Sequence, residues 1–296
     1  MPAEFSDLSR LDRVKYYTAN LFLRALIGGF KLIPYPQRIR AMGWLVARVM
    51  APLAGFDRRV RDNLILTCPD LAESEVRHLC RAVPNNAGRS LIELYSGQSF
   101  IDHATAAEIG GPGLAALQEA REAGRPVILM TGHFGNYDAA RAKLISMGFE
   151  MGALYRRMAN PYFNEHYLRT ISTIGTPLFE QGRRGMIEMV RHLKQGGIIA
   201  IVGDLHVQEG VDLDFFGQPA ITSIVPAELA LKQDAALIPV YAIRKPDGLN
   251  FQIVMHEPIA HSDPVTMTQE INDGLEDLIR DHMDQWFWIH RRWKSA

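Results

Sequence analysis

Short apolar runs alternate with amphipathic stretches through the second half of the chain. Two runs of five residues, at 126–130 and 198–202, contain no charged or polar side chain, which predicts buried strands. Further strands are predicted at 151–155, 237–243 and 250–255. Apolar positions at helical spacing predict helices at 114–123, 136–145, 184–194, 223–233 and 268–286. This alternation predicts an α/β fold in which helices cover both faces of a mostly parallel central sheet.

The first hundred residues are predicted to be mostly helical. Residues 1–61 are basic and helical in pattern, and 71–99 contain a helix or helix pair that Ser74 is expected to cap. We therefore expect a basic, amphipathic, membrane-associating segment at 1–61 and a single α/β domain at 62–296.

Composition narrows the class of protein. The chain has 296 residues and a net charge of −1, with 47% apolar and 22% charged residues, which excludes a disordered chain. Two cysteines in a chain of this length exclude a disulfide scaffold, and the neutral balance argues against a nucleic-acid binder. However, residues 1–61 carry 11 Lys/Arg and 4 Asp/Glu, a net charge of +7, so the remainder carries −8. Such a basic leading segment is attracted to an anionic membrane surface.

The stretch at 16–34 comes nearest to a membrane span. Arg24 and Lys31 interrupt it and Pro34 ends it, so no spanning helix is predicted. Acidic residues precede it and no small-residue cleavage site follows, so no signal peptide is predicted either. Two interpretations stay open, namely an amphipathic helix packed on the core and a helix lying in a membrane interface.

A histidine and an aspartate follow the first apolar strand. His133 lies in a glycine-bearing turn, and Asp138 falls in the first turn of a helix that Asn136 is expected to cap. A carboxylate that holds one ring nitrogen of His133 leaves the other free as a general base near pH 7. Because the sequence has no Gly-x-Ser-x-Gly elbow, we favour direct attack by a substrate hydroxyl over an acyl-enzyme. The alternative is a structural histidine that caps the turn.

A second pair, Asp204 and His206, follows the strand at 198–202. Asp204 is predicted to support the active-site network or to bind an acceptor sugar, and the alternative is a residue that caps the loop. These side chains lack the close pairing of a zinc motif such as His-Glu-x-x-His, so no catalytic metal is expected.

Basic residues follow other predicted elements. Arg156 comes directly after the strand at 151–155, whereas Arg183 and Arg184 open a helix. Guanidinium groups and helix N–H groups together suit the recognition of phosphate or carboxylate. The alternative for each is a solvated face.

Taken in order, the motifs resemble those of the lipid A biosynthesis late acyltransferases, the lauroyl/myristoyl type within the lysophospholipid acyltransferase superfamily. His133-x4-Asp138 matches the family's His-x4-Asp/Glu motif (HX4D), and residues 155–161 are similar to its Tyr-Arg-x-x-x-Asn-Pro block. The resemblance covers nearly the whole chain. Further matches are Asn63–Leu71 to an Asn-Leu-x-x-x-x-Pro-(Asp/Glu)-Leu segment, Asp204, the Phe-Phe-Gly turn at 215–217 and Trp-Ile-His-Arg-Arg-Trp-Lys at 288–294.

The resemblance implies an O-acyltransferase that needs no cofactor. Its expected donor is an acyl-acyl carrier protein, and its expected acceptor is a phosphorylated glucosamine disaccharide that carries hydroxyacyl chains. His133 would deprotonate the acceptor hydroxyl and Asp138 would orient His133, while a turn N–H or Arg156 would stabilise the oxyanion. Arg156, Arg183 and Arg184 would hold acceptor phosphates. The implied location is the cytoplasmic face of the bacterial inner membrane, with peripheral attachment.

Other functions remain open at this point. Asp204-Leu205-His206 departs from the family's frequent Asp-Gln motif, which leaves room for another acceptor such as a phosphatidylinositol mannoside or a lysophospholipid. A hydrolase would use a His/Asp-activated water, and a peripheral lipid-binding module would need no catalytic histidine.

Overall fold

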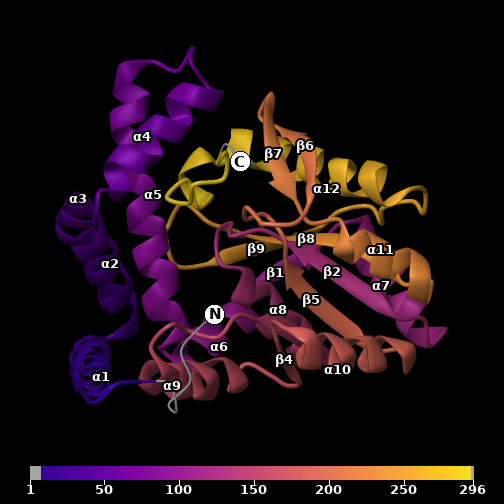
Figure 1. Ribbon diagram of the computed structural model, residues 1–296, viewed down its shortest axis with the longest axis horizontal. Helices are drawn as coiled ribbons and strands as arrows, with labels where there is room; N and C mark the ends of the chain where they lie inside the picture. The colour runs from indigo at the N-terminus through magenta and orange to yellow at the C-terminus, as the bar shows by residue number, and fades with distance from the viewer. Residues whose placement is uncertain (1–7, 295–296) are drawn as a thin grey trace.

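The chain folds into a mixed α/β arrangement, seen in a computed structural model that describes residues 8–294 (Figure 1). The strands are β1 (Glu108–Gly110), β2 (Val127–Thr131), β3 (Met151–Tyr155), β4 (Leu178–Glu180), β5 (Ile198–Val202), β6 (Val211–Phe215), β7 (Gln218–Thr222), β8 (Ala236–Arg244) and β9 (Phe251–Met255). The helices are α1 (Arg10–Lys31), α2 (Tyr35–Leu45), the π-helical turn η2 (Val46–Met50), α3 (Ala51–Ala54), α4 (Phe56–Thr67), α5 (Glu73–Leu94), α6 (Gln98–Thr105), α7 (Pro112–Glu122), α8 (Tyr137–Ser146), α9 (Pro161–Ser172), α10 (Arg183–Lys194), α11 (Val225–Gln233), α12 (Pro264–Asp281) and the 3-10 turn η3 (Met283–Gln285).

A seven-stranded sheet lies at the centre, with the strand order β1-β9-β8-β2-β5-β3-β4. β2 pairs in parallel with both β5 and β8, and β3 pairs in parallel with β5 and β4. β9 runs antiparallel to β8, and β1 pairs in parallel with β9. The predicted mostly parallel sheet is therefore confirmed.

The side chains of β2 alternate between the two faces of the sheet, as the period of a strand requires. Val127 and Leu129 join a buried core that includes residues of α7 and α8. Ile128 and Met130 join a second buried core that includes residues of α10, α11 and α12. Both faces are thus covered, which explains why the sequence of this strand is an uninterrupted apolar run.

The N-terminal helices stack along one side of the sheet (Figure 1, indigo to purple). Ile39 and Met42 of α2 belong to the same buried core as Val127 of β2, so this layer is packed into the rest of the molecule. The boundary predicted between residues 61 and 62 falls inside α4.

Several local predictions were wrong. Ser74 lies in the first turn of α5 and does not cap it, because Ala72 occupies the N-cap position. The last helix ends at Asp281 and not at residue 286, and the aromatic residues beyond it follow the short turn η3. The prediction also missed β1, β4, α9 and the β6–β7 hairpin, although Val-Asp-Leu-Asp-Phe in β6 alternates as a half-buried strand does.

Between residues 8 and 294 no single helix combines the length and the apolarity needed to cross a membrane. One pair of helical segments, Tyr35–Ala54 and Phe56–Thr67, meets both criteria together but bends by 82° between its two parts.

Candidate active site

The register of the two central strands places the predicted site residues side by side. Thr131 at the end of β2 pairs with Val202 at the end of β5, and the Gly203 N–H donates to the Thr131 carbonyl at 3.0 Å. His133 and Asp204 each lie two residues beyond this last pair. Because the carboxyl ends of parallel strands meet at one edge of the sheet, the two side chains emerge together there.

His133 and Asp204 form a close hydrogen-bonded pair. The Nδ1 atom of His133 lies 2.7 Å from Oδ1 of Asp204, and the backbone N–H of His133 donates to Oδ2 at 2.8 Å. The indole Nε1–H of Trp286 donates to the same Oδ2 at 2.8 Å. An ionised carboxylate only accepts hydrogen bonds, so the proton of a neutral His133 ring sits on Nδ1 and Nε2 is left as the base.

The carboxyl group of Asp204 is buried and yet ionised. Burial by itself would raise the pKa of this carboxyl, but the charge and hydrogen bonds of His133 and the indole of Trp286 outweigh it and hold the pKa below its ordinary value. The His133 ring makes an edge-to-face contact with Tyr137 and a tilted contact with Phe287, with ring centroids 5.6 and 5.9 Å away. Within the part of the chain that the structure describes, Nε2 of His133 has no hydrogen-bond partner.

A sharp turn carries His133 into α8. Gly135 has φ +52°, and its amide N–H donates to the Gln285 carbonyl at 2.9 Å. The next amide, of Asn136, donates to the Ala242 carbonyl at 3.3 Å. The Asn136 side chain caps α8 by accepting from the Asp138 N–H at 3.1 Å, as the sequence predicted. Backbone hydrogen bonds to two distant segments therefore fix the turn that carries His133, the candidate catalytic turn.

A buried polar network supports this turn from the side of α5. Arg244 makes a two-pronged ion pair with Glu93, whose side chain is fully buried, at 2.5 and 2.7 Å. Glu93 also accepts from the Asn136 side chain at 2.8 Å. Ser90 and Asn86 donate to the Gly135 carbonyl at 2.8 and 3.5 Å. Every partner lies far from the turn in sequence, which is why sequence patterns gave no sign of this network.

Asp138 does not make the hydrogen bond predicted for it. The carboxylate that holds His133 Nδ1 is that of Asp204, and among residues 8–294 no hydrogen bond joins Asp138 to His133. Asp138 lies instead 3.8 Å from the Arg141 guanidinium, one turn along α8. Burial raises its pKa, and Arg141 only partly offsets that effect. The reason is geometric, because the strand register brings Asp204 against the ring while the turn at Gly135 carries Asp138 into the helix.

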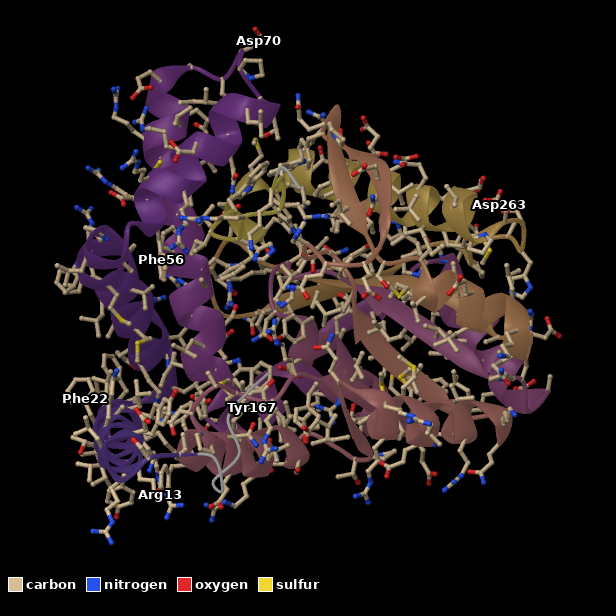
Figure 2. All side chains as sticks on the ribbon, viewed as in Figure 1. Arg13, Phe22, Phe56, Asp70, Tyr167 and Asp263 are labelled. Carbon is tan, nitrogen blue, oxygen red and sulfur yellow. The ribbon has the colours of Figure 1, made fainter. Side chains whose placement is uncertain are left out.

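Two cavities meet at His133. The larger, of about 590 Å³, opens between the ends of β2, β3 and β5 and helices α10 and α11. The smaller, of about 250 Å³, lies between α5 and the catalytic turn and is mostly apolar. Four residues line both cavities, namely His133, Tyr137, Asp138 and Tyr167 of α9, which Figure 2 labels between the helical layer and the sheet.

Comparison with known proteins identifies the family of the chain. A family model described as "Bacterial lipid A biosynthesis acyltransferase" matches residues 6–295. The chain belongs to this family.

Individual relatives are distant from this acyltransferase in sequence. It is 26% identical over 272 residues to the lipid A biosynthesis lauroyltransferase of Escherichia coli (strain K12), a match that covers 89% of this chain and 87% of the relative. It is 24% identical over 185 residues to the phosphatidylinositol mannoside acyltransferase of Mycobacterium tuberculosis (strain CDC 1551 / Oshkosh), covering 61% and 58%. It is 23% identical over 180 residues to a lipid A biosynthesis acyltransferase of Haemophilus influenzae (strain ATCC 51907 / DSM 11121 / KW20 / Rd), covering 60% and 56%.

The three arginines predicted to bind phosphate do not lie together in the structure of the acyltransferase. Arg156 lines the larger cavity together with His133. Arg183 and Arg184 are exposed at the start of α10 and do not line that cavity, and Arg184 pairs with Glu188 at 3.0 Å. The structure thus brings one of the three to the site, because Arg183 and Arg184 lie on the exposed side of α10, whereas Met186 and Met189 of the same helix line the cavity.

A further histidine of the site, His290, was not assigned a role from the sequence, although it lies in the segment at 288–294 that resembles the family. Its Nε2 accepts from the His206 backbone N–H at 3.2 Å, and its ring lines the larger cavity. Burial lowers its pKa to about 4, while Asp204 opposes that shift and His133, Lys294 and Arg292 add to it. His290 is therefore neutral at pH 7, with its ring proton on Nδ1.

The rest of the aromatic and basic C-terminal segment is mostly structural. Trp286, Trp288 and Arg292 are buried at 1% exposure or less, so these side chains are packed inside the molecule. Arg292 donates to the Ile221 carbonyl at 2.6 Å and stacks over Phe215. In the described range, no three histidine, cysteine or acidic side chains lie close enough together to hold a metal ion.

Proposed function

We propose that this acyltransferase moves a fatty acyl chain from acyl-acyl carrier protein to a hydroxyl group of a phosphorylated lipid A precursor. The observation that carries the proposal is the His133–Asp204 pair, which leaves Nε2 of His133 free in a residue that lines both cavities. A transfer between two substrates needs one base that both can reach. The relatives named as lipid A acyltransferases support the acceptor.

The proposed chemistry needs no covalent intermediate on the protein. Nε2 of His133 takes the proton of the acceptor hydroxyl as its oxygen attacks the thioester carbonyl carbon. The tetrahedral adduct then collapses to the ester, the carbon–sulfur bond breaks, and the imidazolium returns its proton to the leaving thiolate. Asp204 stabilises the imidazolium at 2.7 Å, and Asp138, which lines both cavities, adds a second negative charge nearby.

Arg156 is the proposed donor to the oxyanion of that adduct and to an acceptor phosphate. The backbone N–H groups of His133, Gly135 and Asn136 are already bonded to Asp204, Gln285 and Ala242, so they are not available to an oxyanion. Arg156 lines the larger cavity from the end of β3, where a guanidinium can face a developing negative charge.

We propose peripheral attachment of the N-terminal helices to the cytoplasmic face of the inner membrane. Most of the exposed large apolar side chains of the described chain lie on α1–α4, and Figure 2 shows Phe22 of α1 pointing away from the rest of the molecule. Apolar side chains beside a basic surface suit the boundary of an anionic bilayer. The exposed set on this side is Leu11, Val14, Tyr17, Leu21, Phe22, Leu32, Trp44, Val49, Met50, Leu53, Ile65 and Leu66.

The test is acyl transfer by the purified full chain, with an acyl-acyl carrier protein as donor. The acceptors are a phosphorylated, hydroxyacylated glucosamine disaccharide and, in parallel, a phosphatidylinositol mannoside. We expect transfer to the disaccharide. The transfer rate should fall at least about 10³-fold in His133→Ala, because this variant has no general base to activate the acceptor hydroxyl. His261→Ala, on the loop before α12, is the matched control and should keep wild-type activity.

Three outcomes would contradict the proposal. Activity near wild type in His133→Ala would exclude the base mechanism. Transfer only to the mannoside, the acceptor in the name of the mycobacterial relatives, would replace the acceptor. Thioester cleavage at the same rate with and without acceptor would identify a hydrolase.

A further inference from the structure

A large groove lies on the outer side of α5, apart from the two cavities at His133. Its volume is about 980 Å³, the largest of the described cavities. One helix face of α5 lines it, α2 and η2 form one wall, and the β8–β9 turn with η3 forms the other. None of the proposed catalytic residues lines this groove.

The groove is basic. Six of its lining side chains are Arg or Lys, and Asp284 is the one carboxylate among them. Three of the six pair with carboxylates outside the lining, namely Arg77 with Glu73, Arg244 with Glu93 and Lys245 with Glu108. Arg48 and Arg81 are exposed, and within residues 8–294 neither has a hydrogen bond or an ion pair. The lining cations are Arg48, Arg77, Arg81, Arg89, Arg244 and Lys245.

The cations follow the geometry of a helix. Arg81 lies four residues after Arg77, and Arg89 lies eight residues after Arg81. The three side chains line the same groove from α5 and span roughly 18 Å along its axis. Arg89 is held by Asn85 at 2.6 Å and by the Gly248 carbonyl at 2.9 Å, but by no carboxylate. An extended row of cations, and not a single point, faces the groove.

The groove adjoins the catalytic centre. Asn86 and Gln285 line both the groove and the 250 Å³ cavity that contains His133. A molecule held in the groove is thus separated from that cavity by one layer of side chains.

We propose that this groove docks the carrier protein of the acyl donor, through a helix of the carrier that presents carboxylates at one-turn spacing. The inference rests on the proposed function, because it takes the donor to be a thioester on a carrier protein. Charge complementarity favours this occupant. A single phosphate would contact only one point of an 18 Å row, and a flat bilayer does not enter a groove walled on both sides.

The experiment compares two charge-reversed variants of the full chain. Arg48→Glu/Arg81→Glu changes the groove, and Arg191→Glu/Lys194→Glu makes the same change on the exposed side of α10. Each is assayed with an acyl-acyl carrier protein and with the same acyl chain on a pantetheine thioester that lacks the protein. Binding of the carrier protein itself is measured by fluorescence anisotropy at two salt concentrations.

We expect the groove variant to raise KM for the carrier-bound donor at least tenfold, with kcat changed less than twofold. Its kinetics with the pantetheine thioester should equal those of the wild type, and the α10 variant should change neither. Carrier binding should weaken with salt in the wild type and be largely lost in the groove variant.

The inference is overturned if the groove variant binds the carrier as the wild type does, or if both donors are impaired equally. It is also overturned if the variant loses binding to anionic vesicles while KM for the carrier is unchanged. A wild-type protein that binds the carrier through the groove but transfers from neither donor contradicts the proposed function and not the docking site.

Discussion

His133 and Asp204, 71 residues apart in the sequence, meet through two hydrogen bonds of 2.7 and 2.8 Å at the ends of paired strands. This contact predicts that Asp204 supports the base. Asp204→Asn puts an amide opposite Nδ1 and favours the wrong ring tautomer, so kcat should fall about 10²- to 10⁴-fold. Single-turnover acyl transfer by the folded variant, checked by circular dichroism, measures this.

The matched control is Asp138→Asn. It leaves the His133–Asp204 contact intact, so its loss of kcat should be smaller than that of Asp204→Asn. A larger loss in Asp138→Asn would mean that the carboxylate named by the HX4D motif, and not Asp204, supports the base.

The strands and the catalytic turn were predictable, because a period of two, apolar runs and helix caps are local signals. The run at 198–202 and the cap at Asn136 appear in the structure as expected. The partner of His133 was not predictable in the same way. Spacing pointed to Asp138, five residues away, whereas the hydrogen bond to Asp204 depends on which strands are neighbours in the sheet.

The residues that hold the turn at Gly135 in place are even harder to identify from the sequence. Glu93 lies near the end of α5 and Arg244 at the end of β8, and no local sequence pattern indicates that they pair. Long-range topology decides such contacts. The family resemblance bridged part of this gap, since it singled out Asp204 and the segment around Trp288 before their partners were known.

The Glu93–Arg244 pair should contribute strongly to folding stability. Glu93→Gln leaves a buried guanidinium without its countercharge, so the free energy of unfolding should fall by about 3–5 kcal/mol. Urea denaturation followed by circular dichroism measures it. Glu73→Gln removes an exposed partner of Arg61 and should lower the free energy of unfolding far less, because solvent screens this pair. Equal losses in the two variants would show that the buried network does not stabilise the fold.

Gly135 should tolerate no side chain. An alanine Cβ there would collide with the Ala242 carbonyl, in addition to the strain of φ +52°. Gly124→Ala has a similar φ of +64° but open space around it, so it isolates the strain at about 1–2 kcal/mol. We expect Gly135→Ala to lose several-fold more stability than Gly124→Ala in thermal unfolding, and to lose acyl transfer because the turn carries His133. Similar melting temperatures would contradict this.

His290 should make the folded protein sensitive to acid. Its pKa is about 4 when folded and about 6.5 when unfolded, so between these values the unfolded chain binds a proton that the folded chain does not. The stability is fully present above pH 6.5 and is lost as pH falls toward 4. Because the ring is partly exposed to solvent, we discount the effect to about 1 kcal/mol between pH 7.5 and 5. His290→Gln keeps an acceptor for the His206 N–H but does not titrate. Urea denaturation should therefore show a correspondingly smaller drop in the free energy of unfolding between pH 7.5 and 5. An equal drop in both proteins would argue against a depressed pKa.

The exposed apolar face of the N-terminal helices should hold the protein on anionic membranes. Phe22 and Leu32 are 68% and 88% exposed, and the segment around them is basic. Phe22→Ser/Leu32→Ser removes apolar area without changing charge, so vesicle binding should weaken at least tenfold while transfer to a detergent-dispersed acceptor stays near wild type. Ile187→Ser/Val265→Ser, at 53% and 40% exposure on α10 and α12, is the control that should bind as the wild type does. Flotation is measured with vesicles of anionic lipid and of neutral lipid. Neutral vesicles remove the electrostatic contribution to binding, whereas Phe22→Ser/Leu32→Ser removes the apolar contribution. If the two double variants float equally, this face does not contact the bilayer.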